Sequence, residues 1–223
     1  MKFTHVGKAA DGTPLALVVR AFSHYQPADA NWNTLMDSRS LAQIAVASDS
    51  DAKFNFTIVD ARSEEPFALP TLTLSILDID QGKNNTKRET VMVYGYEKYT
   101  LSNDTAVEVG QDAKGRTYFR SGSMGEGADN PSDPMKLSTW QQRRAVEYEF
   151  VNKSSFLVET FFSAGPGLGG NLIFGGPSLL GCDQEAAKPT RQPQAAMSAR
   201  MARALDGDEA AWDQVAALVR KWT

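Results

Sequence analysis

Short segments in which apolar and polar residues alternate recur through most of the chain. The clearest is Leu69–Ile79, where Leu72, Leu74 and Ile76 point one way and the residues between them point the other. A period of two predicts a β-strand with one face on a core. The same pattern, or a β-rich composition, predicts strands at Leu15–Ala21, Leu41–Ala47, Phe54–Asp60, Thr71–Ile79, Thr90–Tyr94, Tyr99–Leu101, Ala106–Val109, Thr117–Ser121, Ala145–Val151, Ser155–Ser163 and Leu172–Phe174.

One predicted strand has acidic residues on its polar face. Val146, Tyr148 and Phe150 are expected to face inward, and Glu147 and Glu149 to face water. The VNKSSF sequence that ends this strand predicts a hairpin to the next one. Many short strands with turn residues between them, and no alternation of strands with helices, predict an all-β fold. We expect an antiparallel β-sandwich of a jelly-roll-like type.

The pattern changes after Cys182, so we expect residues 1–182 to form the β-sandwich domain. Residues 183–193 are polar with two prolines and are typical of a linker. Residues 194–223 are predicted to form a C-terminal α-helical tail. Its last helix has one apolar stripe, made of Trp212, Val215, Ala216, Val219 and Trp222. The stripe would dock on the sandwich itself or on another protein.

Charge and the scarcity of reactive side chains exclude several functions. The net charge of −4 predicts no nucleic-acid partner, because such binding needs clustered positive charge. Arg143–Arg144 and Lys87–Arg88 are isolated pairs that we interpret as solvated surface. A single cysteine excludes an intrachain disulfide framework and a Cys-rich zinc site. With only two histidines, a nucleophilic triad is not expected, and we predict that the chain is not an enzyme.

No apolar run reaches the roughly 20 residues that a membrane-spanning helix needs. Four Asn-x-Ser/Thr sequons favour a secretory history, and they begin at Asn55, Asn84, Asn103 and Asn152. We therefore expect a secreted or cell-surface glycoprotein whose presequence has been removed, with an intracellular protein as the alternative.

The loop after the clearest strand has acidic residues at metal-binding spacing. Asp78, Asp80 and Glu89 occupy positions one, three and twelve of a twelve-residue stretch, as in an EF-hand loop. Glycine and lysine at positions five and six, and strands at both ends, exclude an EF-hand itself. Oxygen ligands from these residues and Asn84 suit Ca²⁺, so the sequence predicts a calcium site here. The alternative is a solvated, asparagine-rich turn.

A second polar loop spans residues 122–134 and is rich in glycine and proline. Glu126, Asp129, Asn130 and Asp133 could together ligate a cation or bind sugar hydroxyls. Asx-turns before the two prolines would explain the same residues without a ligand.

Residues 22–33 mix aromatic and short polar side chains in a way that suits a carbohydrate platform. Tyr25 and Trp32 would stack on the apolar face of a sugar, and Asn33 would bind its hydroxyls. Aromatic residues that close one end of the core are the alternative.

In architecture the chain resembles extracellular β-sandwich modules that bind carbohydrate, often with a structural Ca²⁺, although no motif identifies a family. This resemblance implies a noncatalytic recognition module. A structural subunit docked through its C-terminal helix is one alternative. A hydrolase is another, because Glu147 and Glu149 lie about 7 Å apart along their predicted strand.

Overall fold

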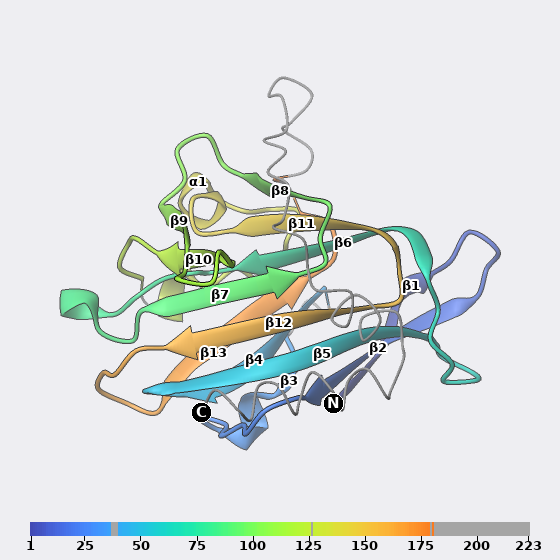
Figure 1. Cartoon of the computed structure of the whole chain (residues 1–223), viewed down its shortest axis with the longest axis horizontal. Helices are drawn as coiled ribbons and strands as arrows, with labels where there is room; N and C mark the ends of the chain where they lie inside the picture. Colours follow the sequence, from blue (N-terminus) through green and yellow to red (C-terminus); the bar gives the residue numbers. More distant parts are fainter. Residues whose placement is uncertain (37–39, 126, 179, 181–223) are drawn as a thin grey trace.

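A computed structural model of the chain describes residues 1–36, 40–125, 127–178 and 180 (Figure 1). The predicted linker and helical tail therefore lie outside the described residues. In chain order the elements are β1 (Lys2–Lys8), β2 (Pro14–Ala21), η1 (Ala30–Trp32), β3 (Thr34–Leu35), β4 (Leu41–Ala47), β5 (Ser50–Asp60), β6 (Leu69–Leu77), η2 (Lys83–Asn85), β7 (Glu89–Tyr94), β8 (Lys98–Leu101), β9 (Val107–Gln111), β10 (Thr117–Ser121), η3 (Gly127–Asp129), α1 (Thr139–Gln142), β11 (Val146–Lys153), β12 (Ser155–Phe162) and β13 (Gly169–Gly175).

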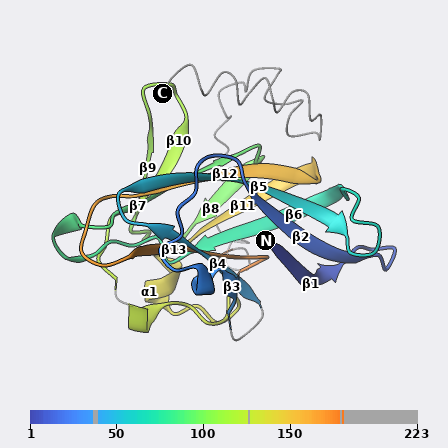
Figure 2. The same cartoon turned by 90° about the horizontal axis from the view of Figure 1, so that it is seen from below.

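The strands form two antiparallel sheets that pack face to face (Figures 1 and 2). Sheet A has the order β1-β2-β5-β12-β7-β10-β9, and sheet B has the order β3-β4-β13-β6-β11-β8. The all-β, two-sheet prediction is confirmed. Most consecutive strands lie in different sheets, with changes at β2–β3, β4–β5, β5–β6, β6–β7, β7–β8, β8–β9, β10–β11, β11–β12 and β12–β13. Such crossings are a feature of Greek-key and jelly-roll sandwiches.

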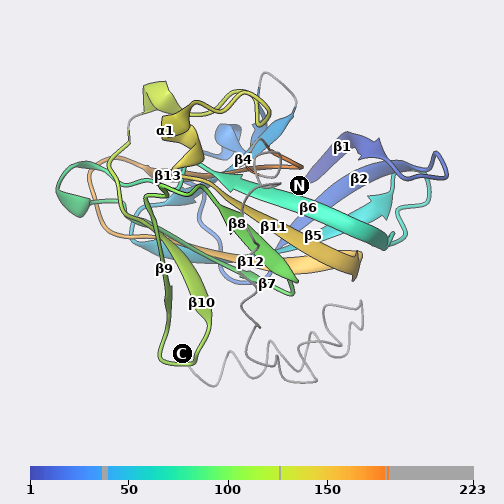
Figure 3. The ribbon, with the colours of Figure 1, turned by 90° about the horizontal axis from the view of Figure 1, so that it is seen from above.

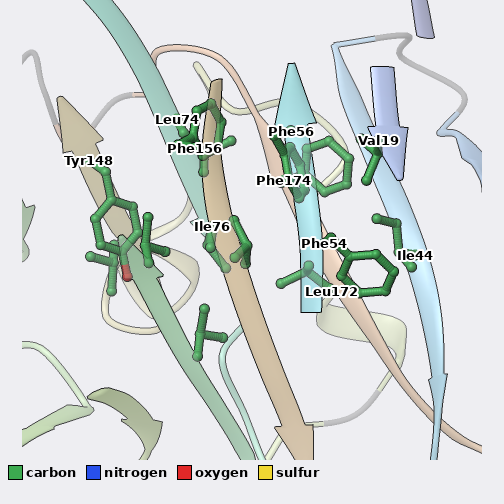
Figure 4. Packing of buried hydrophobic residues seen from close by; sticks show 14 of the residues in the cluster. Val19, Ile44, Phe54, Phe56, Leu74, Ile76, Tyr148, Phe156, Leu172 and Phe174 are labelled. Carbon is green, nitrogen blue, oxygen red and sulfur yellow. The ribbon is translucent and has the colours of Figure 1, made fainter. Parts of the chain in front are cut away.

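The core between the sheets is rich in aromatic rings, which come from strands of both sheets. Phe56 and Phe156 of sheet A stack with ring centres 5.3 Å apart, and Phe174 of sheet B meets Phe56 edge-on at 5.0 Å (Figure 4). Burying a side chain of this size contributes about 1.5–3 kcal/mol, so these contacts stabilise the pairing of the sheets.

The predicted hairpin at VNKSSF is wrong. β11 pairs with β6 and β8 in sheet B, whereas β12 pairs with β5 and β7 in sheet A. The chain therefore crosses between the sheets at Ser154, just after Asn152 takes a left-handed backbone conformation (φ 52°). Both strands bury alternate apolar residues in the same core, and that pattern is the same for strands in one sheet or in facing sheets.

A second apolar cluster, which we call the outer cluster, covers the outside of sheet B. It consists of Leu41, Leu77, Leu137, Ala145, Ile173 and Leu180. The segment that contains α1 supplies part of this cover, and the β9–β10 hairpin projects on the opposite side of the sandwich (Figure 3). Sheet B is consequently buried on both faces over part of its area.

Candidate cation-binding and recognition site

Two loops meet at the end of the sandwich where β6 finishes and β7 begins (Figure 1). The Gln81 N–H donates to the Ser123 carbonyl at 3.1 Å, and the Gly125 N–H donates to the Gln81 carbonyl at 3.0 Å. The Glu89 N–H donates to the Asp80 carbonyl at 3.2 Å. Main-chain hydrogen bonds thus join the β6–β7 connection to the loop of residues 122–134, although about forty residues separate them in sequence.

Three carboxylates converge where these loops meet, and we call them the acidic cluster: Asp78, Asp80 and Asp129. One oxygen from each lies within 4.8 Å of the others. The sequence placed Asp78 and Asp80 in a predicted metal site and Asp129 in a separate ligand loop. The structure brings the two sets together.

Arg144, in the turn between α1 and β11, lies against the acidic cluster with only 1% of its surface exposed. Its Nη1 is 2.9 Å from Asp129 Oδ2 and 3.7 Å from an oxygen of each of the other two carboxylates. Its Nε donates to Ser123 Oγ at 3.3 Å, and its Nη2 donates to the Met124 carbonyl. The interpretation of Arg143–Arg144 as solvated surface is therefore wrong for Arg144. The carboxylates that compensate its charge come from two distant segments.

Burial makes ionisation of the acidic cluster unfavourable. Desolvation, with repulsion from Asp80 and Asp129, raises the pKa of Asp78 to about 8 despite the attraction of Arg144. Desolvation also raises the pKa of Asp80 to about 6, against the opposing effect of Arg144. One guanidinium is thus too little positive charge for three carboxylates in this environment.

Glu89, the first residue of β7, is a fourth acidic group beside the cluster. Its side chain is 1% exposed, and its Oε1 has no hydrogen-bond partner in the described structure. Burial, with the charges on Asp80 and Asp78, raises its pKa well above the usual value. The main-chain hydrogen bond from Glu89 to Asp80 places this residue beside the acidic cluster, and its role as a cation ligand stays a prediction. Asn84, the remaining predicted ligand, is an exposed residue of η2 with φ 57°.

Gly125 closes the loop over the acidic cluster. A Cβ at this position would lie 1.6 Å from Asp80 Oδ2 and 2.7 Å from Arg144 Nη1. Only glycine allows the main chain to approach the carboxylate and the guanidinium so closely.

Trp140, on α1, presents an exposed ring beside this charged group. Its ring centre lies 4.7 Å from Arg144 Cζ and 4.9 Å from Arg143 Cζ, and 42% of the residue is exposed. A capping box between Ser138 and Gln141 fixes the short helix. The Gln141 amide also donates to the Asp129 carbonyl at 2.9 Å. Sequence reasoning missed Trp140, because a lone tryptophan in a polar segment gives no pattern.

Exposed or half-buried side chains lie on α1 and on the loop that precedes it. We call them the recognition face, and they are Trp140, Met124, Met135 and Asp129. The two methionines are 45% and 47% exposed. The recognition face therefore combines a rigid aromatic ring, two flexible apolar side chains and the carboxylate of Asp129.

The other residues predicted in the second loop have different environments. Glu126 lies outside the described residues, and Asn130 is half-buried. Asp133 Oδ1 accepts from the Met135 N–H at 2.9 Å, and Lys136 Nζ lies 3.3 Å from Asp133 Oδ2. Asp133 therefore forms an Asx-type turn before Pro134, as the alternative interpretation of this loop expected.

The predicted platform of residues 22–33 is divided between structural and exposed groups. The Tyr25 hydroxyl lies 2.9 Å from Asn33 Oδ1 and 2.8 Å from the Ala45 carbonyl, and its ring meets Phe54 edge-on. Asn33 Oδ1 also accepts from the Ala45 N–H at 2.9 Å. Of the three residues predicted to bind a sugar here, Trp32 has the exposed side chain, with 41% of the residue accessible.

The two glutamates of β11 have structural partners. Glu147 Oε2 accepts from the Ser178 N–H at 2.8 Å, the Ser178 hydroxyl at 2.9 Å and the Ser75 hydroxyl at 3.2 Å. Glu149 lies 3.0 Å from Lys98 Nζ. The expectation that Glu147 simply faces water is therefore wrong, because residues after β13 cover this part of sheet B.

No family model matches the chain, and no curated protein has a significantly similar sequence. Among solved structures, the N-terminal domain of the Streptococcus gordonii adhesin Sgo0707 is 17% identical with a TM-score of 0.47, over 78% of this chain and 46% of that one. The adhesin domain of PrgB from Enterococcus faecalis is 13% identical with a TM-score of 0.40, over 74% and 57%. The chain thus spans about half the length of these two solved chains.

Within the described residues, none of the helices has the length and apolar character needed to cross a bilayer.

Proposed function

We propose that the chain is a noncatalytic recognition module of an extracellular or cell-surface type, which binds carbohydrate and is stabilised by Ca²⁺. The observation that carries the proposal is the recognition face, where Trp140 is exposed and held against the buried Arg144. The ion would lie at the base of this face, in the acidic cluster.

The chemistry of the recognition face suits a sugar. A flat indole ring stacks on the apolar face of a pyranose, and neighbouring carboxylates and amides accept hydrogen bonds from its hydroxyls. Trp140 offers the ring, and Asp129 offers half-buried oxygen atoms on the adjoining loop. Because α1 and the loop are fixed by Gln141 and Arg144, a ligand would meet groups that are already in place.

Two further observations support this class of function. Glu147 and Glu149, the acidic pair considered for hydrolysis, are held by structural partners. Of the four sequons, those at Asn84, Asn103 and Asn152 have exposed asparagines, so a glycan could be attached there without disturbing a strand interior. The sequon at Asn55 lies in β5, where the side-chain Oδ1 is buried.

A glycan array probed with wild-type protein in Ca²⁺ tests the proposal. Binding should be lost or reduced at least tenfold in Trp140→Ala and retained in Trp32→Ala, which removes an equally exposed tryptophan elsewhere. Binding that depends on Trp32 instead would move the site to residues 22–33. No glycan bound by the wild-type protein at high density would overturn carbohydrate recognition.

A further inference from the structure

We propose that Asp78, Asp80, Asp129 and Glu89 form a site for one divalent cation of the size of Ca²⁺, with Arg144 as a fixed countercharge that couples the ion to the recognition face. This inference rests on the proposed function for its link to ligand binding, and it replaces the predicted ligand Asn84 by Asp129.

The spacing of the carboxylates fits a single ion. Oxygen atoms of the acidic cluster lie within 4.8 Å of one another. Ca²⁺ binds oxygen at about 2.3–2.6 Å, so two oxygens on opposite sides of one ion are about twice that length apart. This separation is close to the 4.8 Å limit within which the cluster's oxygens lie. Ligands from Asp78 and Asp80 of one loop and Asp129 of another would be bridged by the ion.

The charge balance calls for a divalent cation. When ionised, the three aspartates and the Arg144 guanidinium leave two negative charges, and Glu89 adds a third, so one Ca²⁺ would neutralise two of the three. Arg144 does not satisfy the cluster alone, since its Nη1 is 3.7 Å from both Asp78 and Asp80. That distance is too long for a hydrogen bond.

Glu89 gives an independent indication of a ligand. Its carboxyl is 1% exposed and its Oε1 lacks a hydrogen-bond partner, although a buried polar atom without a partner costs about 1–3 kcal/mol. Its N–H donates to the Asp80 carbonyl at 3.2 Å, so the residue adjoins the cluster. A bound cation would give this oxygen a partner.

Arg144 connects the ion to the recognition face. Its Nη1 contacts Asp129, and its guanidinium lies over the Trp140 ring. The Asp129 carbonyl accepts from Gln141 of the same helix as Trp140. An ion that holds Asp129 therefore also restrains α1, and ligand and ion should each increase the affinity for the other.

Calorimetric titration of the EDTA-treated full chain with CaCl₂ tests the site. We expect one Ca²⁺ per chain, weaker binding of Mg²⁺, and a Ca²⁺-dependent rise in melting temperature. Asp80→Asn and Asp129→Asn should each lower the Ca²⁺ affinity at least tenfold. Asp112→Asn is the matched control, because Asp112 also pairs with an arginine, Arg116, but lies at the β9–β10 turn; its Ca²⁺ affinity should equal that of the wild type. Absence of binding, or an equal response in all three variants, would overturn the inference.

Terbium luminescence locates the ion without altering a carboxylate. Tb³⁺ takes oxygen ligands as Ca²⁺ does, and a nearby tryptophan sensitises its emission. Emission excited through tryptophan should fall in Trp140→Phe, persist in Trp32→Phe and be displaced by Ca²⁺. Emission that survives Trp140→Phe but is lost in Trp32→Phe would place the ion elsewhere and overturn the inference.

Repeating the glycan array in EDTA separates the two proposals. Ion binding at the cluster without any glycan binding would overturn the proposed function and leave the cation site intact. Glycan binding that needs Trp140 but is equal in Ca²⁺ and EDTA would overturn the coupling.

Discussion

Arg144 and Asp129 form an ion pair, with Nη1 and Oδ2 2.9 Å apart, across fifteen residues of chain that include α1. Arg144 is among the largest fully buried side chains of the described structure. Transfer of an isolated charge into a protein interior costs several kcal/mol, so Arg144 needs its acidic partners there. Conversely, the carboxylates need Arg144 as their nearest described cation. The loop of residues 122–134, α1 and the turn that leads into β11 are therefore held together by the charges of Arg144 and its acidic partners.

The first prediction concerns Arg144→Met, which keeps much of the side-chain length and removes the charge. Because it leaves buried carboxylates without their guanidinium, the free energy of unfolding in EDTA should fall by about 3–5 kcal/mol. Urea denaturation at pH 7 measures this loss.

Arg143→Met is the matched control for that experiment. Arg143 pairs with Asp104 at 3.3 Å, and both side chains are substantially exposed, at 34% and 57%. An exposed pair contributes about 0–1 kcal/mol, so this variant should stay near the wild type. Equal losses in the two variants would show that Arg144 does not stabilise the acidic cluster.

The second prediction concerns pH. The pKa of Asp78 is raised to about 8 and that of Asp80 to about 6, so the folded protein keeps protons that the unfolded chain releases near pH 4. The stabilisation is complete below the unfolded pKa and is lost as pH rises through the folded values. In EDTA, this cluster should therefore make the urea midpoint fall between about pH 5 and pH 8.

Asp78→Asn tests the assignment of this slope, since it removes the group with the pKa of about 8. Its urea midpoint should change less than that of the wild type between pH 6 and pH 8. An unchanged slope would assign the pH dependence to other groups.

The third prediction separates structural from binding roles in residues 22–33. Tyr25→Phe removes the hydroxyl that lies 2.8 Å from the Ala45 carbonyl and 2.9 Å from Asn33 Oδ1. Loss of one such hydrogen bond should lower the free energy of unfolding by about 1 kcal/mol. Trp32→Phe, at an exposed position, should change it by less than about 0.5 kcal/mol. Chemical denaturation measures the free energy of unfolding of both variants. A larger decrease in Trp32→Phe than in Tyr25→Phe would contradict these roles.

Most strands could be predicted from the sequence, because burial of alternate residues is a local property. β4 and β10 have the predicted bounds, and β6 and β7 differ from prediction by one or two residues. The pattern missed β1, an edge strand in which only Phe3 is buried and whose pairing shifts between Thr4 and Gly7. Local alternation also does not indicate which sheet a strand joins. The predicted hairpin after β11 is wrong for this reason, because β11 and β12 lie in different sheets.

The candidate site could be predicted only in part. Asp78, Asp80 and Glu89 share a spacing that indicates oxygen ligation, and the glycine-rich loop identified Asp129 as a separate candidate. Their convergence depends on a parallel bridge between Gln81 and Met124, which joins segments far apart in sequence. The buried state of Arg144 follows from the same long-range contacts, so no local pattern reports it.

The fourth prediction concerns Glu147, which accepts hydrogen bonds from both the main chain and the hydroxyl of Ser178. Glu147→Ala should lower the free energy of unfolding by about 1–3 kcal/mol, because two donors and Ser75 lose a charged acceptor. Glu149→Ala removes only a partly exposed pair with Lys98 and should cost less than about 1 kcal/mol. Thermal or urea denaturation compares them, and the reverse order would contradict the structural role of Glu147.

The last prediction concerns the boundary between the β-sandwich and the remainder of the chain. Leu180 is 3% exposed in the outer cluster, where it packs with Leu41, Leu77 and Ile173. Every described strand and every described member of this cluster therefore lies at or before residue 180. A chain ending at residue 182 should therefore unfold cooperatively with a melting temperature close to that of the full chain. Leu180→Ala in that shortened chain should lower the free energy of unfolding by about 2–5 kcal/mol, because it leaves a cavity beneath sheet B. If the shortened chain instead precipitates or melts far below the full chain, residues 183–223 form part of the fold. If it stays folded but loses self-association seen by light scattering, the predicted helix contacts another chain.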